Sequence, residues 1–520
     1  MRERPTSGDR VRYRFGPLER RGLIAGWRGG QIASVAAGLV VGVFVLRWRP
    51  SVAGVILALG FAGAGVMVAV WPVGGRTAEQ WCPLVVRWAM AGLTGSRLQL
   101  AGAPRTGQAV RVDADGVATP VPAAPGRPPG VRLAPTGVFE GLRLVGCPVA
   151  DGATDAGVAI DARSRTATAV LAVRGHSFAL LGPSDQDARV AGWARVLAAL
   201  AREGSAVHRV QWVESCLPDD GGGARRYLRH HAALDGESAA ARSYSDLVEQ
   251  SAPVTRRHRT LLAVSVHTSH AGRAIRASGG GDAGVGAVLL REAMALQRLL
   301  EDTDATVEGI LSPDALAAVY RQAMAPLSQL VSPGSPPFGR DSDVGGTGAA
   351  GPPWPMAVAP TWDAVHTDGT WHATYWIAEW PRVDITPDFL GPLLFSSVRR
   401  SISLVMEPVS PSRAARQVAQ ARTADIADGE LRRRGGFLVT ARQTREKEGV
   451  EHRDTELADG HAQYRFSGYV TVTADDRDAL REGCAALEQA GGQARLELRR
   501  LYGEQDVAFA CTLPLGRGLA

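Results

Sequence analysis

The sequence predicts an α+β fold, in which an N-terminal transmembrane α-hairpin is followed by cytoplasmic α/β and ferredoxin-like α+β domains. Three observations lead to this prediction. Residues 29–71 hold two long apolar runs that are almost free of charge. Apolar patterns with the periods of strands and helices alternate from residue 137 onward. The last quarter of the chain shows a strand, helix, strand pattern that is typical of half a ferredoxin-like sheet.

Composition limits the class of protein. The chain has 520 residues, of which 45% are apolar and 21% are charged, as expected for several folded domains. The net charge is +6, but residues 1–97 contain 13 arginines and 4 acidic residues, which is +9, so the rest contributes 6 − 9 = −3. The body therefore lacks the basic excess of a nucleic-acid-binding protein. Five cysteines without a C-x-x-C pair favour a reduced cytosolic setting over a disulfide framework or a zinc site.

Residues 1–28 read as a basic cytoplasmic leader and residues 29–71 as a two-helix transmembrane hairpin. Two uncharged runs, 29–46 and 51–71, are about 27 and 32 Å long at 1.5 Å per residue, close to the hydrocarbon thickness of a bilayer. Eight arginines precede the first run and two lie in the turn, so both the N-terminus and the body should be cytoplasmic. Gly60, Gly63 and Gly65 give the second run a small-residue face that suits packing against the first helix or another subunit.

Residues 72–135 are expected to form a juxtamembrane helix and a linker rich in Pro and Gly. Thr77 and Gln80 match a capping box, which indicates where the helix begins. Trp81, Val85 and Trp88 line one side of this helix. That side suits either the membrane surface or the body, and the sequence leaves both open.

An α/β domain is expected at residues 136–328, followed by a Gly/Pro linker at 329–356. Short runs rich in β-branched and apolar residues predict strands, and apolar residues at helical spacing predict helices. The expected strands are 166–173, 177–181, 207–213, 261–266 and 305–310, and the expected helices are 186–202, 288–300 and 313–324.

The ferredoxin-like α+β domain is expected at residues 357–520. Strands are predicted at 371–380, 401–407, 464–473 and 494–498. A long polar helical stretch begins at Pro411, and Gly435 and Gly436 should bend it or split it into two antiparallel helices. A further helix should begin at a capping Asp475 and end at Gly491.

The glycine-rich segments of the chain lack the neighbouring residues that a phosphate-binding or dinucleotide-binding motif requires. A phosphate-binding loop needs a lysine after its last glycine, and the only lysine, Lys447, lies in Arg-Glu-Lys-Glu-Gly. Glycines 346, 348 and 351 match G-x-G-x-x-G, but prolines follow where a helix should begin, so a linker is expected there. Glycines 279–286 precede a helix, where an anion site is conceivable and a flexible loop is favoured.

Metal and catalytic constellations are also not predicted. His267 and His270 are three residues apart, and His230 and His231 are adjacent, but no carboxylate spacing completes a ligand set. No catalytic residue, cofactor or metal is therefore nominated, and the chain is not expected to be an enzyme.

Three segments resemble a known family. They are Trp376 to Phe395 (WIAEWPRVDITPDFLGPLLF), Ser467 to Thr473 (SGYVTVT) and Leu496 to Leu515 (LELRRLYGEQDVAFACTLPL). They resemble the non-catalytic N-terminal half of the conjugation ATPase of type IV secretion systems. In that family a similar Pro-Leu-Gly end leads into the nucleotide-binding lobe, whereas only Arg517 to Ala520 follow here. The N-terminal hairpin is similar to the small two-pass inner-membrane subunit of those systems, and the arrangement looks like an actinobacterial membrane protein family from conjugation-like clusters.

The resemblance implies a non-catalytic inner-membrane scaffold subunit that docks a separate ATPase or channel component. Its expected partners are the lipid bilayer, that ATPase and other secretion-system membrane proteins, with a homo-oligomer possible and no direct contact with nucleic acid. Aromatic residues are enriched at protein interfaces, which makes one segment the candidate docking surface, although a core role is slightly favoured for its tryptophans. The candidates are Trp376, Trp380, Phe389, Leu390, Leu393 and Phe395. The alternatives are a membrane-anchored enzyme of unknown chemistry and a subunit of another actinobacterial secretion machine.

Overall fold

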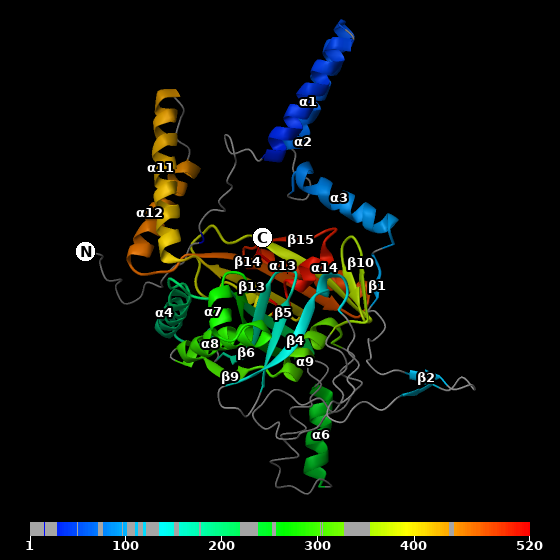
Figure 1. The fold of residues 1–520 in the computed structure, drawn as a ribbon, viewed down its shortest axis with the longest axis vertical. Coiled ribbons are helices and arrows are strands. Elements are labelled where there is room, and N and C mark those ends of the chain that lie inside the picture. Colours follow the sequence, from blue (N-terminus) through cyan, green and yellow to red (C-terminus); the bar gives the residue numbers. More distant parts are fainter. Residues whose placement is uncertain are drawn as a thin grey trace.

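The computed structural model shows an α+β body with a helical hairpin standing away from it (Figure 1). It describes residues 15, 29–48, 50–70, 76–95, 97–100, 110–112, 118–120, 135–149, 155–175, 178–218, 238–251, 256–301, 303, 305–326, 354–435 and 441–519. The expected α+β class and the two N-terminal apolar helices are confirmed.

The two apolar helices are α1 (Gly29–Trp48) and α2 (Val52–Val70), and both are long and apolar enough to cross a membrane. They are not core helices of a soluble body, because most of their large apolar side chains are exposed. A Cβ on Gly65 would lie 2.9 Å from the Ser34 carbonyl oxygen, so this glycine permits the close packing of α1 on α2. Gly60 and Gly63 have nothing within 4 Å of such a Cβ, so they face away from α1.

Helix α3 (Ala78–Leu93) connects the hairpin to the body. Thr77 is its N-cap, as predicted, and the Thr77 amide donates to Gln80 Oε1 at 3.3 Å. Two short pieces of the expected linker, β2 (Val110–Val112) and β3 (Ala118–Pro120), pair with each other.

One large antiparallel sheet joins the two segments that were expected as separate domains. Its strand order is β1-β10-β11-β12-β14-β13-β7-β8-β6-β5-β4, with β15 beside β12 and β9 beside β6. The first half contains β4 (Leu142–Pro148), β5 (Asp155–Asp161), β6 (Thr166–Arg174), β7 (Val207–Pro218), β8 (Arg256–His267) and β9 (Thr306–Ile310). The second contains β10 (Ala357–Pro360), β11 (Val365–Thr367), β12 (Thr370–Glu379), β13 (Arg400–Pro408), β14 (Tyr464–Ala474) and β15 (Glu497–Arg500), while β1 (Gln99–Leu100) extends its edge.

The two halves meet where β7 pairs with β13, with Leu404 opposite Trp212. The order β5-β6-β8-β7 on one side of this seam corresponds to β11-β12-β14-β13 on the other. The pairings recorded in both halves are antiparallel, so the α/β pattern expected for residues 136–328 does not produce a parallel sheet. The helices there do not form crossovers between parallel strands, which a parallel sheet requires.

Helices cover both faces of the sheet. One face packs against α4 (Pro183–Leu200), α7 (Gly272–Ala277) and α8 (Gly281–Glu301) in the first half, and against α10 (Gly391–Leu394) and α13 (Arg477–Gln493) in the second. The opposite face packs against α9 (Pro313–Met324), α14 (Gln505–Ala510) and the C-terminal tail, which we define as residues 511–519. Helix α6 (Ala239–Ser251) lies at the far end of the molecule from α1 (Figure 1).

The predicted split of the long polar stretch is confirmed. Helix α11 (Pro411–Gly435) and helix α12 (Ala441–Ala458) lie against each other and project from the body. We call this pair the helical arm.

Three local predictions were wrong. Residues 178–180 form a 3-10 turn, η2 (Phe178–Leu180), rather than part of a strand. The N-cap of α13 is Asp476, not Asp475, and Asp476 Oδ1 accepts from the backbone amides of Asp478 and Ala479. Gly491 does not end α13. It lies inside the helix, where an added Cβ would be 2.6 Å from Leu498 Cδ1, so it allows the helix to approach β15 closely.

Candidate docking surface

The six predicted docking residues do not form one surface. Leu393 is fully buried in the core between α10 and α13, so it serves packing. Phe395 is 74% exposed, only two residues further along the chain. Trp376, Trp380 and Phe389 are half-buried, as is Leu390. The Trp376 indole donates to Ser467 Oγ at 3.0 Å, which ties that side chain to β14.

A cluster of aromatic rings, which we call the aromatic socket, contains two of the predicted residues. Trp380, Phe389 and Phe466 form it, with ring centroids 5.5 Å apart for Trp380 and Phe466. Phe15 of the basic leader enters the socket, with its ring 5.0 Å from Trp380 and 5.7 Å from Phe389. Sequence patterns did not identify Phe15 or Phe466, since they lie about 370 and 80 residues away from this segment.

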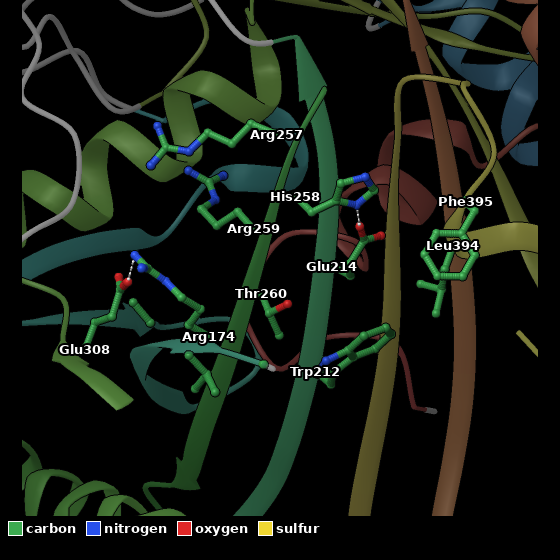
Figure 2. A pocket seen from close by; sticks show the side chains of 13 residues that line it. Arg174, Trp212, Glu214, Arg257, His258, Arg259, Thr260, Glu308, Leu394 and Phe395 are labelled. Atoms are coloured by element: carbon green, nitrogen blue, oxygen red, sulfur yellow. Dashed lines mark hydrogen bonds and ion pairs between the residues drawn. The ribbon is translucent and has the colours of Figure 1, made fainter. Parts of the chain in front are cut away.

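Phe395 lines an open cleft of about 580 Å³, together with the C-terminal end of β6, the middle of β7 and the N-terminal end of β8 (Figure 2). Figure 2 shows Leu394 and Phe395 on one side of the cleft and three arginines on the other, with Glu214 and His258 between them. The arginines are Arg174, Arg257 and Arg259. The cleft therefore joins an apolar wall to a basic wall.

A buried ion pair supports the apolar wall. Glu214 Oε1 is 2.6 Å from His258 Nδ1, and its other oxygen is 3.5 Å from the Arg400 guanidinium. Arg400 is only 1% exposed and donates to the carbonyl oxygens of Leu394, Ser396 and Val398. Because a buried cation with several acceptors holds a fixed position, Arg400 fixes the backbone that carries Phe395.

Arg259 of the basic wall remains charged at neutral pH. Burial, with a smaller contribution from Arg257, lowers the pKa of Arg259 to about 10, which still leaves the guanidinium protonated. Arg259 donates to Gln322 Oε1 on α9 at 2.7 Å, and Arg174 forms an ion pair with Glu308. The cleft thus presents guanidinium groups beside an exposed phenyl ring, an arrangement that suits an acidic or aromatic protein segment. The Arg-Arg-His-Arg run at 256–259 is a sequence signal that could have indicated this wall, although it was not among the predicted docking residues.

Helix α3 holds the hairpin against the body. The rings of Trp81 and Trp88 lie 5.9 and 5.7 Å from that of Trp362, and Trp81 also contacts Tyr502. Arg76 forms an ion pair with Glu504 at the start of the helix. Of the two placements left open by the sequence, these contacts support packing on the body, while other apolar residues of α3, such as Val85, remain exposed.

The remaining candidate motifs are dispersed. Gly279, Gly280 and Gly281 have positive φ angles and form the turn between α7 and α8. His267 stacks on His270 at 4.3 Å, whereas His230, His231 and glycines 346–351 lie outside the described residues. Within the residues that the structure describes, no three His, Cys, Asp or Glu side chains are grouped so as to hold a metal ion. Burial raises the pKa of the Cys216 thiol, which keeps it protonated beside the cleft.

Residues 254–377 match the model of a protein family described as "Putative type VII ESX secretion system translocon, EccE". The match covers a little under a quarter of the chain, from the start of β8 to near the end of β12. No curated protein matches the chain. The family match and the two apolar helices support a membrane protein of a secretion-system family, and they indicate type VII rather than the type IV or conjugation system that the resemblance implied.

Proposed function

We propose that this chain is a non-catalytic membrane subunit of a type VII ESX secretion translocon. The hairpin fixes it in the bilayer, and the body docks another component of the machine at the cytoplasmic face. The single observation that carries the proposal is the match of residues 254–377 to the EccE family, whose description names such a translocon. The matched segment contains Arg257 and Arg259 and thus contributes two of the three arginines of the basic wall of the cleft.

The contacts of α3 favour a positioning role. Aromatic contacts between α3 and the body, together with the Arg76 to Glu504 ion pair, limit the motion of the body relative to the hairpin. A subunit held in this way can present a docking surface at a fixed height above the membrane. Catalysis requires no such rigid mounting, whereas assembly of several membrane proteins benefits from it.

The cleft is the docking surface that we favour, and its expected occupant is a segment of another membrane component of the translocon. A separate ATPase of the same machine is the second expected partner. Aromatic residues, Phe among them, are enriched at protein interfaces, and arginine is one of the side chains that most often carry the binding energy. Phe395 and Arg257 offer both within one concave surface.

The test is affinity purification of the full-length chain from its native host in mild detergent, with co-purifying proteins identified by mass spectrometry. Recovery of type VII membrane components is expected. Phe395→Ala should reduce that recovery at least tenfold, because loss of an interface anchor typically costs about 2 kcal/mol or more. Ile426→Ala is the matched control, since Ile426 is equally exposed but lies on the helical arm.

Two results would contradict the proposal. Purification of the chain alone, or with conjugation components, would remove the translocon role. Turnover of a substrate that Glu214→Gln abolishes would instead support an enzyme built on the Glu214 to His258 pair, the only close acid and histidine contact within the described cleft lining.

A further inference from the structure

Helix α3 has apolar residues on two opposite faces, and the body covers one of them. Trp81 and Trp88 lie on the covered face, where their rings contact Trp362 of the body. The opposite face, which we call the outer face, is exposed, and the three largest of its side chains are 55% to 84% exposed. A helix that is apolar on both sides needs a cover for each side. The outer face consists of residues at helical spacing, namely Cys82, Val86, Ala89, Met90 and Leu93.

Helix α3 begins at the body-side end of the membrane hairpin. Gln31 of α1 donates from Nε2 to the Ala69 carbonyl oxygen of α2 at 2.8 Å, so the beginning of α1 and the end of α2 form one end of the hairpin. Glu79 of α3 lies against Gly30, at that same end. In Figure 1, α3 runs crosswise to α1, between this end of the hairpin and the sheet. With the hairpin in the bilayer, α3 lies at the bilayer surface.

The length and the polar flank of α3 suit a helix that lies in this surface. Its 16 residues extend about 24 Å at 1.5 Å per residue, which is less than the roughly 30 Å of a hydrocarbon core. Gln80, Arg87 and Thr94 follow one another at intervals of seven and line the flank between the two apolar faces. Because a long cationic side chain reaches water or headgroups while its stem stays on apolar surface, Arg87 is compatible with such a position.

We propose that α3 lies in the plane of the membrane surface, with its outer face inserted into lipid and its opposite face on the body. The occupant of the outer face is the bilayer, because α2 ends at Val70 and α3 begins at Ala78, so the chain leaves lipid directly before this helix. The outer face is uncharged, so its insertion does not depend on anionic lipid. The body is then separated from the bilayer by one helix diameter, about 10 Å. This inference rests on the membrane role of the hairpin in the proposed function, and not on the identity of the secretion machine.

The test measures the depth of a nitroxide spin label in the full-length chain, reconstituted in phosphatidylcholine nanodiscs. Cys82 is exposed and the other four cysteines are buried, so the unaltered chain takes the label on the outer face. Two reference variants combine Cys82→Ser with Leu59→Cys on α2 or Leu247→Cys on α6, at positions that are both exposed. The label should lie in hydrocarbon at residue 59 and in water at residue 247, because α6 is at the far end of the molecule from α1.

Oxygen concentrates in lipid and a nickel chelate stays in water, so the ratio of their collision rates with the label reports its depth. At Cys82 we expect a ratio between those of the two references, with or without phosphatidylglycerol. Val86→Asn together with Met90→Asn should lower the ratio of inserted to withdrawn α3 by roughly a hundredfold, because full burial of each such side chain changes a partition constant about tenfold or more. Arg87→Gln, on the polar flank, is the matched control and should leave the depth nearly unchanged.

The outcomes separate this inference from the proposed function. Nickel collisions as frequent at Cys82 as at residue 247, with residue 59 still protected, would overturn the inference and leave the membrane anchor intact. Nickel access at both Cys82 and residue 59 would take the hairpin out of the bilayer and remove the proposed function as well. A Cys82 label shielded from both reagents would show that protein covers the outer face, and a larger effect of Arg87→Gln than of the double variant would assign the contact to charge, so either result would overturn the inference. The Cys82 measurement needs no substitution, so it stays decisive if the double variant misfolds.

Discussion

The ion pair between Asp161 and Arg517 should be one of the contacts on which the stability of the body depends most. Arg517 lies in the C-terminal tail and donates from Nε and Nη2 to Asp161 Oδ2 at 2.9 and 2.7 Å. Asp161 is almost fully buried at the end of β5, and its Oδ1 accepts from the amides of Arg163 and Ser164. The pair therefore fastens the tail to the first half of the sheet.

The cost of breaking this pair follows from its burial. Burial alone would raise the pKa of Asp161, but Arg517 and the hydrogen bonds from Ser164 lower it below its usual value. Asp161→Asn keeps the turn acceptor and the shape but leaves the buried guanidinium without its counter-charge. Removing one partner of a buried pair costs about 3–5 kcal/mol. Since Arg517 keeps a hydrogen bond to the Val138 carbonyl oxygen, we expect the lower end, about 3 kcal/mol.

Urea unfolding of the full chain in mild detergent, followed by tryptophan fluorescence, measures this cost. Glu140→Gln is the matched control, because Glu140 forms an exposed ion pair with Arg163, two residues from Asp161. Exposed pairs contribute about 0–1 kcal/mol, so the control should unfold nearly as the unaltered chain does. If Asp161→Asn were as mild as Glu140→Gln, the reasoning that the tail is fastened by this pair would be refuted.

Three other predictions follow from single sites. Burial lowers the pKa of His372 to about 3, so the free energy of unfolding should fall as pH drops from about 6.5 toward 3. His372→Gln should flatten this pH profile in unfolding titrations, and an unchanged profile would contradict the prediction. Gly157→Ala should cost about 1–3 kcal/mol, because its Cβ would lie 2.8 Å from the Ser312 carbonyl oxygen, whereas Gly175→Ala, with open space, should be nearly neutral by the same urea assay. Trp362→Ala should release α3 from the body and make tryptic cleavage within α3 about tenfold faster, because it removes two aromatic contacts of about 0.5–1.5 kcal/mol each. An unaltered cleavage rate would show that other contacts hold the hairpin.

Local features were predictable because neighbouring residues determine them. The capping residue Thr77 and the glycines that split α11 from α12 act within a few residues of their own position. Gly491 shows where local reasoning fails. Its sequence position suggested a helix end, but contact with Leu498 of β15 determines its role, and that contact depends on how the helix packs on the sheet.

The candidate docking residues were predictable only in part. Sequence composition singled out the aromatic segment, and its residue Phe395 lines the cleft, whose role in docking stays a proposal. Leu393 faces the core instead, because the side of α10 on which it lies packs against α13. The basic wall of the cleft comes from β6 and β8, which precede Phe395 by more than a hundred residues. No local pattern brings these segments together.

The sequence by itself determined the membrane hairpin. The thickness of a bilayer sets the length of an apolar helix that can cross it, so such a helix is visible in the sequence as an uncharged apolar run of that length. It also determined the α+β class through the periods of its apolar residues. Only the tertiary structure decided that β7 and β13 join the two halves in one sheet and that Arg517 reaches Asp161. It also decided that the cleft forms between strands β6, β7 and β8 on one side and Leu394 and Phe395 on the other. These are contacts between residues far apart in the chain, and their pairing depends on the burial and register of the whole sheet.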